Sequence, residues 1–384
     1  MPLINNCYGY GKSGGTPQLC DQVDNFKVRV SAGELSAKLT WSAPTKDEDN
    51  SFVGARIVRK VGSAPKNKSD GTVVYEGTEF TYTDTGLNEG TTYYYRAFAY
   101  NDKKKYQTAL CVTSIKAKYV YATLNDNSWD TIRSISDEGQ AANYWAVGDC
   151  KEIVLNGTVK NLTLSNYTVC VFILGFDHNS SIEGANRIHF QLGKTALTDG
   201  KDICLCDSNY GASNGPGYFF MNEGGSSGNG TNRGGWAESW MRTSILGTSL
   251  TDYSGTFIGL LPTELIAVLK SVTKYTDNTG ANKNSASAIT ATTDYAFLLS
   301  EFEVYGRVWS ANSYESREQA QYAYYSAGNS KIKYKHNGVT ISACHWLRSP
   351  SSNSDLSFCC VDSDGSETGF IAVRNNGIAP AFCV

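Results

Sequence analysis

Short segments in which polar and apolar residues alternate follow one another through the first hundred residues of this chain. Residues 25–30, 37–41 and 53–59 show the alternation most clearly, and residues 91–100 form a longer segment of the same kind. A period of two places every second side chain on one face of a strand, so each segment has a face to bury. Short strands at this spacing predict a β-sandwich, which we place at residues 19–117.

The remaining residues, 118–384, mix helical and strand patterns and predict a second, α+β domain. Trp129, Ile132 and Ile135 recur at helical spacing, with Asn127 or Ser128 as candidate cap. The other expected elements are strands at 151–155, 169–175, 187–192 and 295–299, and helices at 236–245, 260–270 and 315–325. Residues 1–18 are too rich in glycine to fold alone, and we expect either an arm that docks onto another subunit or a floppy terminus.

Composition argues against several classes of partner. The 384 residues carry a formal net charge of −3, with a pI near 5.9, and nucleic-acid binding requires a clustered basic surface. No run of about eighteen apolar residues occurs, so we expect no membrane insertion. The first residues lack the basic and apolar regions of a secretory signal, which predicts synthesis and folding in a cytosol.

Cysteine and histidine usage indicates neither a disulfide framework nor a metal centre. The eleven cysteines are scattered, and neither Cys204 with Cys206 nor Cys359 with Cys360 has the ligand spacing of a zinc site. Asp362 and Asp364 resemble a fragment of a calcium loop without its remaining acidic ligands, which leaves calcium open. We expect no metal and no cofactor.

The sequence motifs give little support for catalysis. The glycine-rich stretch 209–235 contains no phosphate-binding pattern, and HExxH does not occur. Cys344 and His345 are neighbours on a predicted strand, so their side chains point to opposite faces and do not pair. We therefore expect no catalytic residues and no enzyme.

The first domain resembles a fibronectin type III domain. Trp41 occupies the place of the core aromatic on the second strand, and Tyr93 follows a turn as a tyrosine corner does. The resemblance implies a spacer or docking module, because such domains carry function only through grafted loops.

The second domain resembles the variable proteins of diversity-generating retroelements, a family of gut phage and bacterial surface domains with a C-type-lectin fold. The motifs that carry the resemblance are Trp129 with residues 144–149, then residues 235–242, 260–262, 297–304, 346–350 (Trp-Leu-Arg-Ser-Pro) and 377–380. In those systems a mutagenic reverse transcriptase rewrites chosen codons near the end of the gene. The resemblance implies a variable ligand-binding surface at about residues 351–376.

The resemblance also divides the C-terminal residues into framework and variable positions. The framework positions are Phe358, Cys359, Val361, Gly365, Ala379, Pro380, Phe382 and Cys383. The predicted ligand-binding positions are Leu356, Ser357, Cys360, Asp362, Asp364, Ser366, Thr368, Gly369, Phe370 and Arg374. Leu356 and Phe370 would act as apolar anchors, Arg374 as a forked donor and the aspartates as acceptors. In the alternative reading, Leu356 and Phe370 face inward and the aspartates cap turns.

Together these features predict a receptor-binding protein at a phage tail tip, made in the bacterial cytoplasm and carried on the virion. Its partners would be a host cell-surface protein or glycan and, through the N-terminal region, other tail or surface-assembly proteins. A bacterial surface adhesin with the same face is the first alternative. A thiol enzyme of the related formylglycine-generating type is the second. Tail fibres are often trimeric, but no heptads that would enforce a homotrimer are visible.

Overall fold

A computed structural model describes residues 19–384 except 32–34, 47–50, 213–217 and 224–229. The chain divides into two compact units, Met1–Ala122 and Thr123–Val384, called here the N-terminal and C-terminal units. The division falls slightly beyond the boundary expected after Ala117. The predicted N-terminal arm, residues 1–18, lies outside the described residues, as do parts of the glycine-rich loop.

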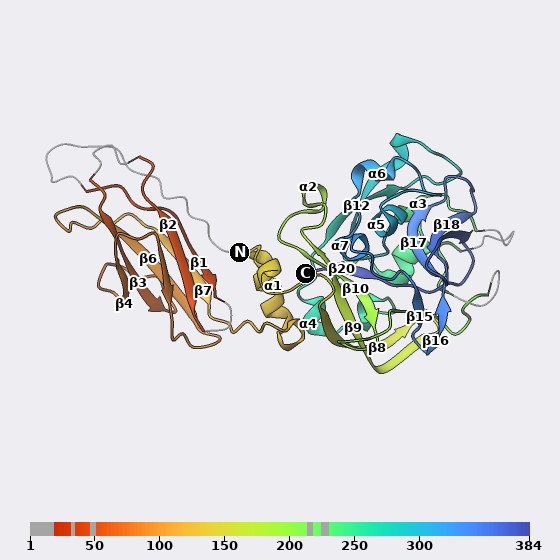
Figure 1. Ribbon diagram of the computed structural model, residues 1–384, viewed down its shortest axis with the longest axis horizontal. Coiled ribbons are helices and arrows are strands. Elements are labelled where there is room, and N and C mark those ends of the chain that lie inside the picture. Colours follow the sequence, from red (N-terminus) through yellow and green to blue (C-terminus); the bar gives the residue numbers. More distant parts are fainter. Residues whose placement is uncertain (1–18, 32–34, 47–50, 213–217, 224–229) are drawn as a thin grey trace. The chain divides into compact units, whose positions relative to one another are not determined.

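The N-terminal unit is a sandwich of two antiparallel sheets (Figure 1). One sheet has the order β1-β2-β5 and the other the order β4-β3-β6-β7. The strands are β1 (Asp24–Val30), β2 (Ala37–Ser42), β3 (Gly54–Val61), β4 (Thr72–Gly77), β5 (Thr81–Asp84), β6 (Thr92–Tyr100) and β7 (Val112–Lys116). The β-sandwich predicted from the alternating segments is confirmed.

The two aromatic residues that the fibronectin type III resemblance singles out, Trp41 and Tyr93, occupy the expected places in this sandwich. Trp41 is buried and meets Phe26 and Tyr75 edge to face. The hydroxyl of Tyr93 accepts a hydrogen bond of 3.0 Å from the backbone N–H of Asn88, five residues upstream. This bond is the defining contact of a tyrosine corner, and it fixes the turn that leads into β6.

The C-terminal unit contains seven described α-helices, most of them one turn long, and thirteen described strands. The helices are α1 (Trp129–Asp137), α2 (Ser180–Glu183), α3 (Gly235–Glu238), α4 (Thr263–Ile266), α5 (Glu301–Tyr305), α6 (Glu315–Glu318) and α7 (Ala323–Ser326). The strands are β8 (Cys150–Val159), β9 (Leu162–Phe176), β10 (Ile188–Lys194), β11 (Ile203–Cys204), β12 (Val272–Asp277), β13 (Ile289–Asp294), β14 (Ala296–Phe297), β15 (Lys333–Lys335), β16 (Gly338–Ala343), β17 (His345–Pro350), β18 (Ser357–Val361), β19 (Glu367–Ile371) and β20 (Ala381–Cys383).

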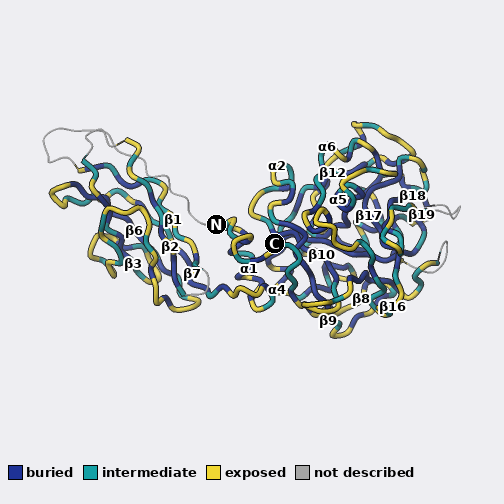
Figure 2. Tube along the Cα trace, viewed as in Figure 1, coloured by how far each residue is buried: buried dark blue, intermediate teal, exposed yellow. Residues whose placement is uncertain are grey.

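A five-stranded sheet, β14-β20-β10-β9-β8, forms the main layer of this unit. Its inner strands are buried along most of their length (Figure 2). Helix α1 packs against it, because Trp129 lies with its ring centroid 5.5 Å from Phe190 and 6.4 Å from Phe382. The predicted cap is present, since the Ser128 side chain accepts from the backbone N–H of Thr131 at 3.1 Å.

Several predicted helices are shorter than expected because tertiary contacts interrupt them. Helix α4 begins after Pro262 but ends at Ile266. The Lys270 N–H donates a hydrogen bond of 2.9 Å to the Cys383 carbonyl instead of continuing the helix. The segment 315–325 splits into α6 and α7, because Gln319 adopts an extended backbone. The segment 236–245 gives the single turn α3 followed by a π-helix at Met241–Leu246.

Within the described parts of the chain, no helix is both long enough and apolar enough to cross a membrane.

Candidate ligand-binding surface

The antiparallel sheet β17-β18-β19 carries the C-terminal segment that the sequence singled out. Trp346 lies opposite Cys360, and Phe358 lies opposite Phe370. All six residues of β17 are buried, and the Trp346 indole donates from Nε1 to the Phe219 carbonyl at 2.8 Å. Strand β17 is thus the buried outer strand of this sheet, and β19 forms the opposite edge.

Arg348 fixes β17 to three neighbouring segments through a fully buried guanidinium. Its Nη2 donates to Glu303 Oε1 at 3.0 Å, and its Nη1 donates to the other oxygen of the same carboxylate. Nε donates to Thr276 Oγ1 at 2.7 Å, and Nη1 also reaches the Leu298 carbonyl at 2.9 Å. The rigid fork of the guanidinium therefore ties β17 to α5, to β12 and to the end of β14.

Lys274 extends this pair into a buried charge cluster, which we define as Glu183, Lys274, Glu303 and Arg348. The Lys274 ammonium donates to Glu183 Oε2 at 2.7 Å, to Glu303 Oε1 at 2.9 Å and to the Tyr322 hydroxyl at 2.9 Å. Burial raises the pKa of Glu183. Burial acts in the same direction on Glu303, but the charges of Arg348 and Lys274 outweigh it and hold the pKa of Glu303 well below its usual range.

Two carboxylates of this cluster and the neighbouring His178 form a group of potential metal ligands among the described residues. Donor atoms of His178, Glu183 and Glu303 lie within 4.8 Å of one another. The Lys274 ammonium already bridges both carboxylates, and a divalent cation there would face two fixed positive charges. Burial, together with the Lys274 charge, lowers the pKa of His178 to about 3. The arrangement suits a structural anchor better than a metal centre.

Two exposed side chains that the sequence analysis missed adjoin this sheet. The buried carboxylate of Glu301 accepts from the backbone N–H groups of residues 309–311 at 2.9–3.2 Å, which fixes the segment that presents Trp309. Trp309 is 62% exposed. The Arg307 side chain is 70% exposed, and its Nη2 lies 2.6 Å from Glu367 at the start of β19. Their exposure depends on tertiary contacts, and the local sequence carries no signal for it.

The segment 351–357 has a fixed backbone because Asn232 binds it. The fully buried Asn232 amide donates from Nδ2 to the carbonyls of Ser351, Ser354 and Ser357 at 2.7–3.0 Å. Its Oδ1 accepts from the Ala281 N–H at 2.7 Å. A loop held through its carbonyls can present side chains in a defined geometry.

The turn between β18 and β19 is organised by the two aspartates. Asp362 Oδ1 accepts from the Ser363 N–H at 2.6 Å and from the Cys344 thiol at 3.0 Å. Asp364 Oδ1 accepts from the N–H and hydroxyl of Ser366 at 2.9 and 2.6 Å. These contacts agree with the alternative reading, in which the pair shapes the turn. A ligand that used these oxygens would compete with internal donors.

The predicted ligand-binding positions do not share one face. Thr368 and Phe370 project from one face of the sheet and Ser357 and Gly369 from the other, because strand neighbours alternate. Leu356 precedes β18, Arg374 follows β19, and Asp362, Asp364 and Ser366 lie in the turn. Among these residues, Gly369, Asp364 and Ser366 are exposed and the other six are half-buried. The structure thus gathers these positions along one hairpin and its flanks.

Cys360 does not belong to this surface, and its prediction as a ligand-binding position is corrected. Its side chain is 1% exposed, and its sulfur lies 3.7 Å from the Phe358 carbonyl and 3.6 Å from Asn376 Nδ2. Residues 358–361 of β18 are all buried, and because successive residues of a strand point to opposite faces, this strand is buried on both faces. The expected framework positions Phe358, Cys359 and Val361 are fully buried with it.

Phe370 and Arg374 form a joint feature at the sheet edge. The Arg374 guanidinium carbon lies 4.1 Å from the centroid of the Phe370 ring, and Nε donates to Asn376 Oδ1 at 3.2 Å. Within the described residues, neither terminal nitrogen of Arg374 has a hydrogen-bond partner. A guanidinium held over an aromatic ring is oriented in advance for a carboxylate or carbonyl.

The thiols named as alternative reactive groups are held in their protonated form. Burial, together with the contact to Asp362, raises the pKa of Cys344 to about 11. Burial places the pKa values of Cys359 and Cys360 well above the ordinary range. Reactive thiols need a lowered pKa. Cys204 Sγ and Cys206 Sγ lie 3.8 Å apart, but no third ligand among the described residues joins them in a metal site.

Replacing Gly365 with alanine is expected to destabilise the C-terminal unit by about 1–2 kcal/mol, because φ is +87° there and a Cβ would meet Ile332 Cγ1 at 3.1 Å. Gly328→Ala is the matched control, since φ is +84° with open space around the Cβ. Urea unfolding should show a larger loss for Gly365→Ala than for Gly328→Ala. Equal losses would mean that Ile332 does not restrict the turn.

The chain was compared with known families, curated proteins and solved structures. Residues 218–384 match a family model described as "Domain of unknown function (DUF6273)". No curated protein matches. The fibronectin type III domain of human contactin 1 matches with a TM-score of 0.23 and 11% identity, over 31% of this chain and 96% of that one. The fibronectin type III domain of the human fibronectin type III domain containing protein 3 matches with a TM-score of 0.21 and 19% identity, over 29% and 94%.

Titin kinase with its flanking domains matches with a TM-score of 0.20 and 18% identity, over 48% of this chain and 31% of that one. The strand order of the two sheets and the tyrosine corner at Tyr93 give the N-terminal unit a fibronectin type III-like β-sandwich fold.

Proposed function

We propose that this protein is a receptor-binding protein, which grips a host-surface protein or glycan through the edge of the sheet β17-β18-β19. The observation that carries the proposal is the contrast between fully buried anchors, such as Arg348, and the exposed residues next to them. We define the recognition surface as the β19 edge with its flanks, on both faces of the sheet: Arg307, Trp309, Leu356, Ser357, Thr368, Gly369, Phe370, Arg374 and the turn 362–366.

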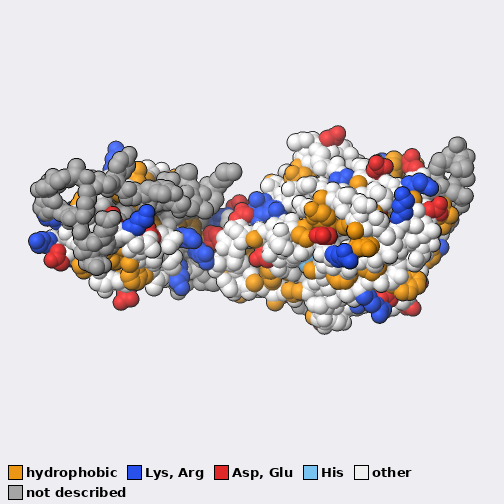
Figure 3. Space-filling model, turned by 90° about the horizontal axis from the view of Figure 1, so that it is seen from above, with side chains coloured by type: hydrophobic (Ala, Val, Ile, Leu, Met, Phe, Trp, Pro, Cys, Tyr) orange, Lys and Arg blue, Asp and Glu red, His pale blue; other side chains and the backbone are white. Residues whose placement is uncertain are grey.

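The physics of this surface resembles that of an antibody paratope. Trp309 and Phe370 supply contact area at small entropic cost, and two arginines supply forked donors. The polar turn supplies adaptable hydrogen bonds. On the face of the C-terminal unit seen in Figure 3, acidic and basic side chains are interspersed among neutral ones.

We propose further that the C-terminal unit has a C-type-lectin-like fold and that a retroelement diversifies its recognition surface. Support comes from β20, which lies between β10 and β14 in the main sheet although it closes the described chain. The hairpin β18–β19, which precedes it in sequence, belongs to a separate sheet. Changes in that hairpin therefore need not disturb the main layer.

Deep sequencing of the gene in its natural population tests the diversification. We expect substitutions at Leu356, Thr368, Phe370 and Arg374, with residues 358–361 constant, because burial on both faces leaves them no room. Cys360 distinguishes the two expectations, because the resemblance places it among the variable positions whereas its burial predicts a constant residue. A uniform gene, or changes spread evenly over it, would contradict diversification.

Binding is tested with the labelled full chain on a panel of bacteria from the same community. Trp309→Ala and Phe370→Ala should each weaken binding tenfold or more, because truncating a central aromatic anchor costs about 2 kcal/mol or more. Val154→Ala, at a partly exposed position on β8, is the control. Unchanged binding by both aromatic variants would reject this surface.

We place the protein at a phage tail tip, with the fibronectin type III-like unit as spacer and the N-terminal region as attachment to other tail proteins. A bacterial surface adhesin with the same recognition surface is the alternative, and tail genes beside this gene would favour the first. We propose no catalytic role, because the raised pKa values of Cys344, Cys359 and Cys360 disfavour a thiol nucleophile.

A further inference from the structure

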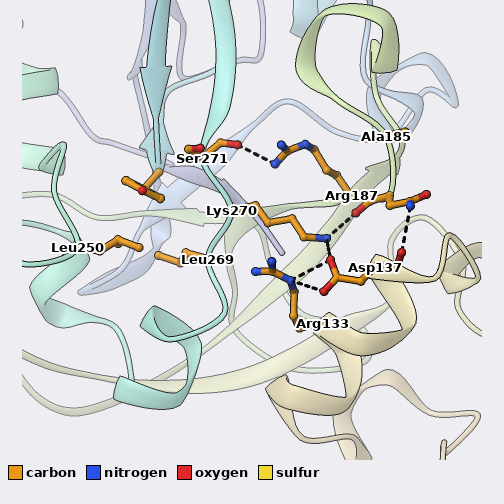
Figure 4. A pocket seen from close by; sticks show the side chains of 10 residues that line it. Arg133, Asp137, Ala185, Arg187, Leu250, Leu269, Lys270 and Ser271 are labelled. Carbon is orange, nitrogen blue, oxygen red and sulfur yellow. Dashed lines mark hydrogen bonds and ion pairs between the residues drawn. The ribbon is translucent and has the colours of Figure 1, made fainter. Parts of the chain in front are cut away.

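A pocket outside the recognition surface carries an excess of positive charge (Figure 4). It has a volume of ≈ 470 Å³, and its lining includes Arg133, Asp137, Arg187, Leu269, Lys270 and Tyr295. These residues come from α1, the loop before β10 and the segment that follows α4, with Tyr295 from between β13 and β14. Three cations therefore face one carboxylate.

Asp137 cannot neutralise this pocket, because two cations share it. Arg133 Nε donates to both of its oxygens at 3.0 and 2.9 Å, and Lys270 Nζ lies 2.7 Å from Oδ1. The Arg187 guanidinium has no carboxylate partner among the described residues, and its Nη1 donates to the Ser271 carbonyl at 2.7 Å. The pocket thus retains the charge of about two cations.

Both arginines also keep unused donors. Arg133 Nη1 donates to the Val268 carbonyl at 2.7 Å, but no described residue accepts a hydrogen bond from its Nη2. The same holds for Nη2 of Arg187, whose Nε is buried without a partner. Gly184, with φ at +93°, makes room for that side chain, because a Cβ there would lie 2.8 Å from Arg187 Nε. The local backbone is thus compatible only with a small residue beside this guanidinium.

The walls restrict the kind of anion that fits. The volume suits an organic molecule better than a simple inorganic ion. Leu269 and the ring of Tyr295 offer apolar surface, and Asn186 and Ser271 offer neutral polar groups. We propose that this pocket binds an acidic saccharide, with its carboxylate on Arg133 and Arg187, its hydroxyls on the polar wall and its C–H face on the apolar wall.

Isothermal titration of the full chain with sodium glucuronate at low ionic strength tests the proposal, with glucose as the neutral comparison. We expect saturable binding of glucuronate and none of glucose. Arg187→Gln and Arg133→Gln should each weaken it tenfold or more. Asp137→Asn should tighten it several-fold, because the competing carboxylate is lost. Arg317→Gln removes an exposed cation on α6 and should change nothing.

Absence of glucuronate binding, or binding that survives both arginine substitutions, would overturn the proposal. Inorganic sulfate that binds as tightly as glucuronate would overturn the saccharide assignment. Far-ultraviolet circular dichroism and urea unfolding of each variant separate lost binding from lost folding. Because these residues are distinct from the recognition surface, a negative result here leaves the proposed function unaffected, and the converse also holds.

Discussion

Replacing Arg348 with methionine is expected to destabilise the C-terminal unit by about 3–5 kcal/mol, because the substitution leaves Glu303 with too little compensating charge in the interior. Methionine preserves much of the side-chain length, so the loss reports the guanidinium and its hydrogen bonds to Glu303, Thr276 and Leu298. Tryptophan fluorescence during urea unfolding measures the effect, since all tryptophans other than Trp41 lie in the C-terminal unit.

A double-mutant cycle with Glu303→Gln isolates the pair. Glutamine can keep the helix cap at Ser300, whose N–H donates to Glu303 Oε2 at 3.0 Å. We expect the double variant to lose less than the sum of the single losses, because removing both charges leaves no unpaired ion. Additive losses would show that Arg348 and Glu303 do not depend on each other.

The ion pair between Arg307 and Glu367 is the matched control. This pair also joins a guanidinium to a carboxylate, at 2.6 Å. The Arg307 side chain is 70% exposed, however, so solvent screens the attraction. Arg307→Met should change the unfolding free energy by no more than about 1 kcal/mol. A loss as large as that of Arg348→Met would contradict the importance of burial.

Features that depend on neighbouring residues could be predicted from the sequence. The cap at Ser128 and the apolar stripe of α1 lie within one segment, and the turn that makes Tyr93 a corner is equally local. The sandwich followed from alternation, since each strand displays its own buried face. These signals need no knowledge of distant partners.

The buried charge cluster depends on residues far apart in the chain and could not be predicted. Arg348 lies in the fully buried β17 and Lys274 at a buried position of β12, but the sequence around each residue does not identify its partner. The position of Cys360 was misjudged for a related reason. A strand buried on both faces shows no alternation of polar and apolar residues, so the sequence of β18 does not tell which residues face a ligand.

Acidification from pH 6.5 to 4.5 is expected to destabilise the C-terminal unit steeply. All four histidines of the chain lie in this unit. Burial lowers the pKa of His178 and of His345 to about 3, that of His336 to about 4 and that of His189 well below 6.5. Below pH 6.5 the histidines bind protons in the unfolded chain but stay neutral in the folded chain, so the free energy of unfolding falls as the pH falls.

Two buried carboxyl groups oppose this trend. Burial raises the pKa of Glu183 and of Glu315 from 4.5 to about 7, so between these values the folded chain binds protons that the unfolded chain has released. Stability from this source falls as the pH rises from 4.5 to 7. Each group contributes about 1.4 kcal/mol per pH unit. Four histidines against two carboxyls leave a net loss of about 3 kcal/mol per pH unit on acidification below 6.5.

Near pH 7 the two effects balance, because the histidines of the unfolded chain are then mostly neutral while the two buried carboxyl groups lose their protons in the folded chain. A broad stability maximum near pH 7 follows, with little further change toward pH 8. Urea unfolding followed by tryptophan fluorescence from pH 4.5 to 8 measures the curve. His345→Asn should reduce the acid slope by about 1.4 kcal/mol per pH unit, because one titrating group is removed. A flat curve between pH 4.5 and 6.5 would show that the histidines are protonated equally in both states, and hence that burial does not keep them neutral.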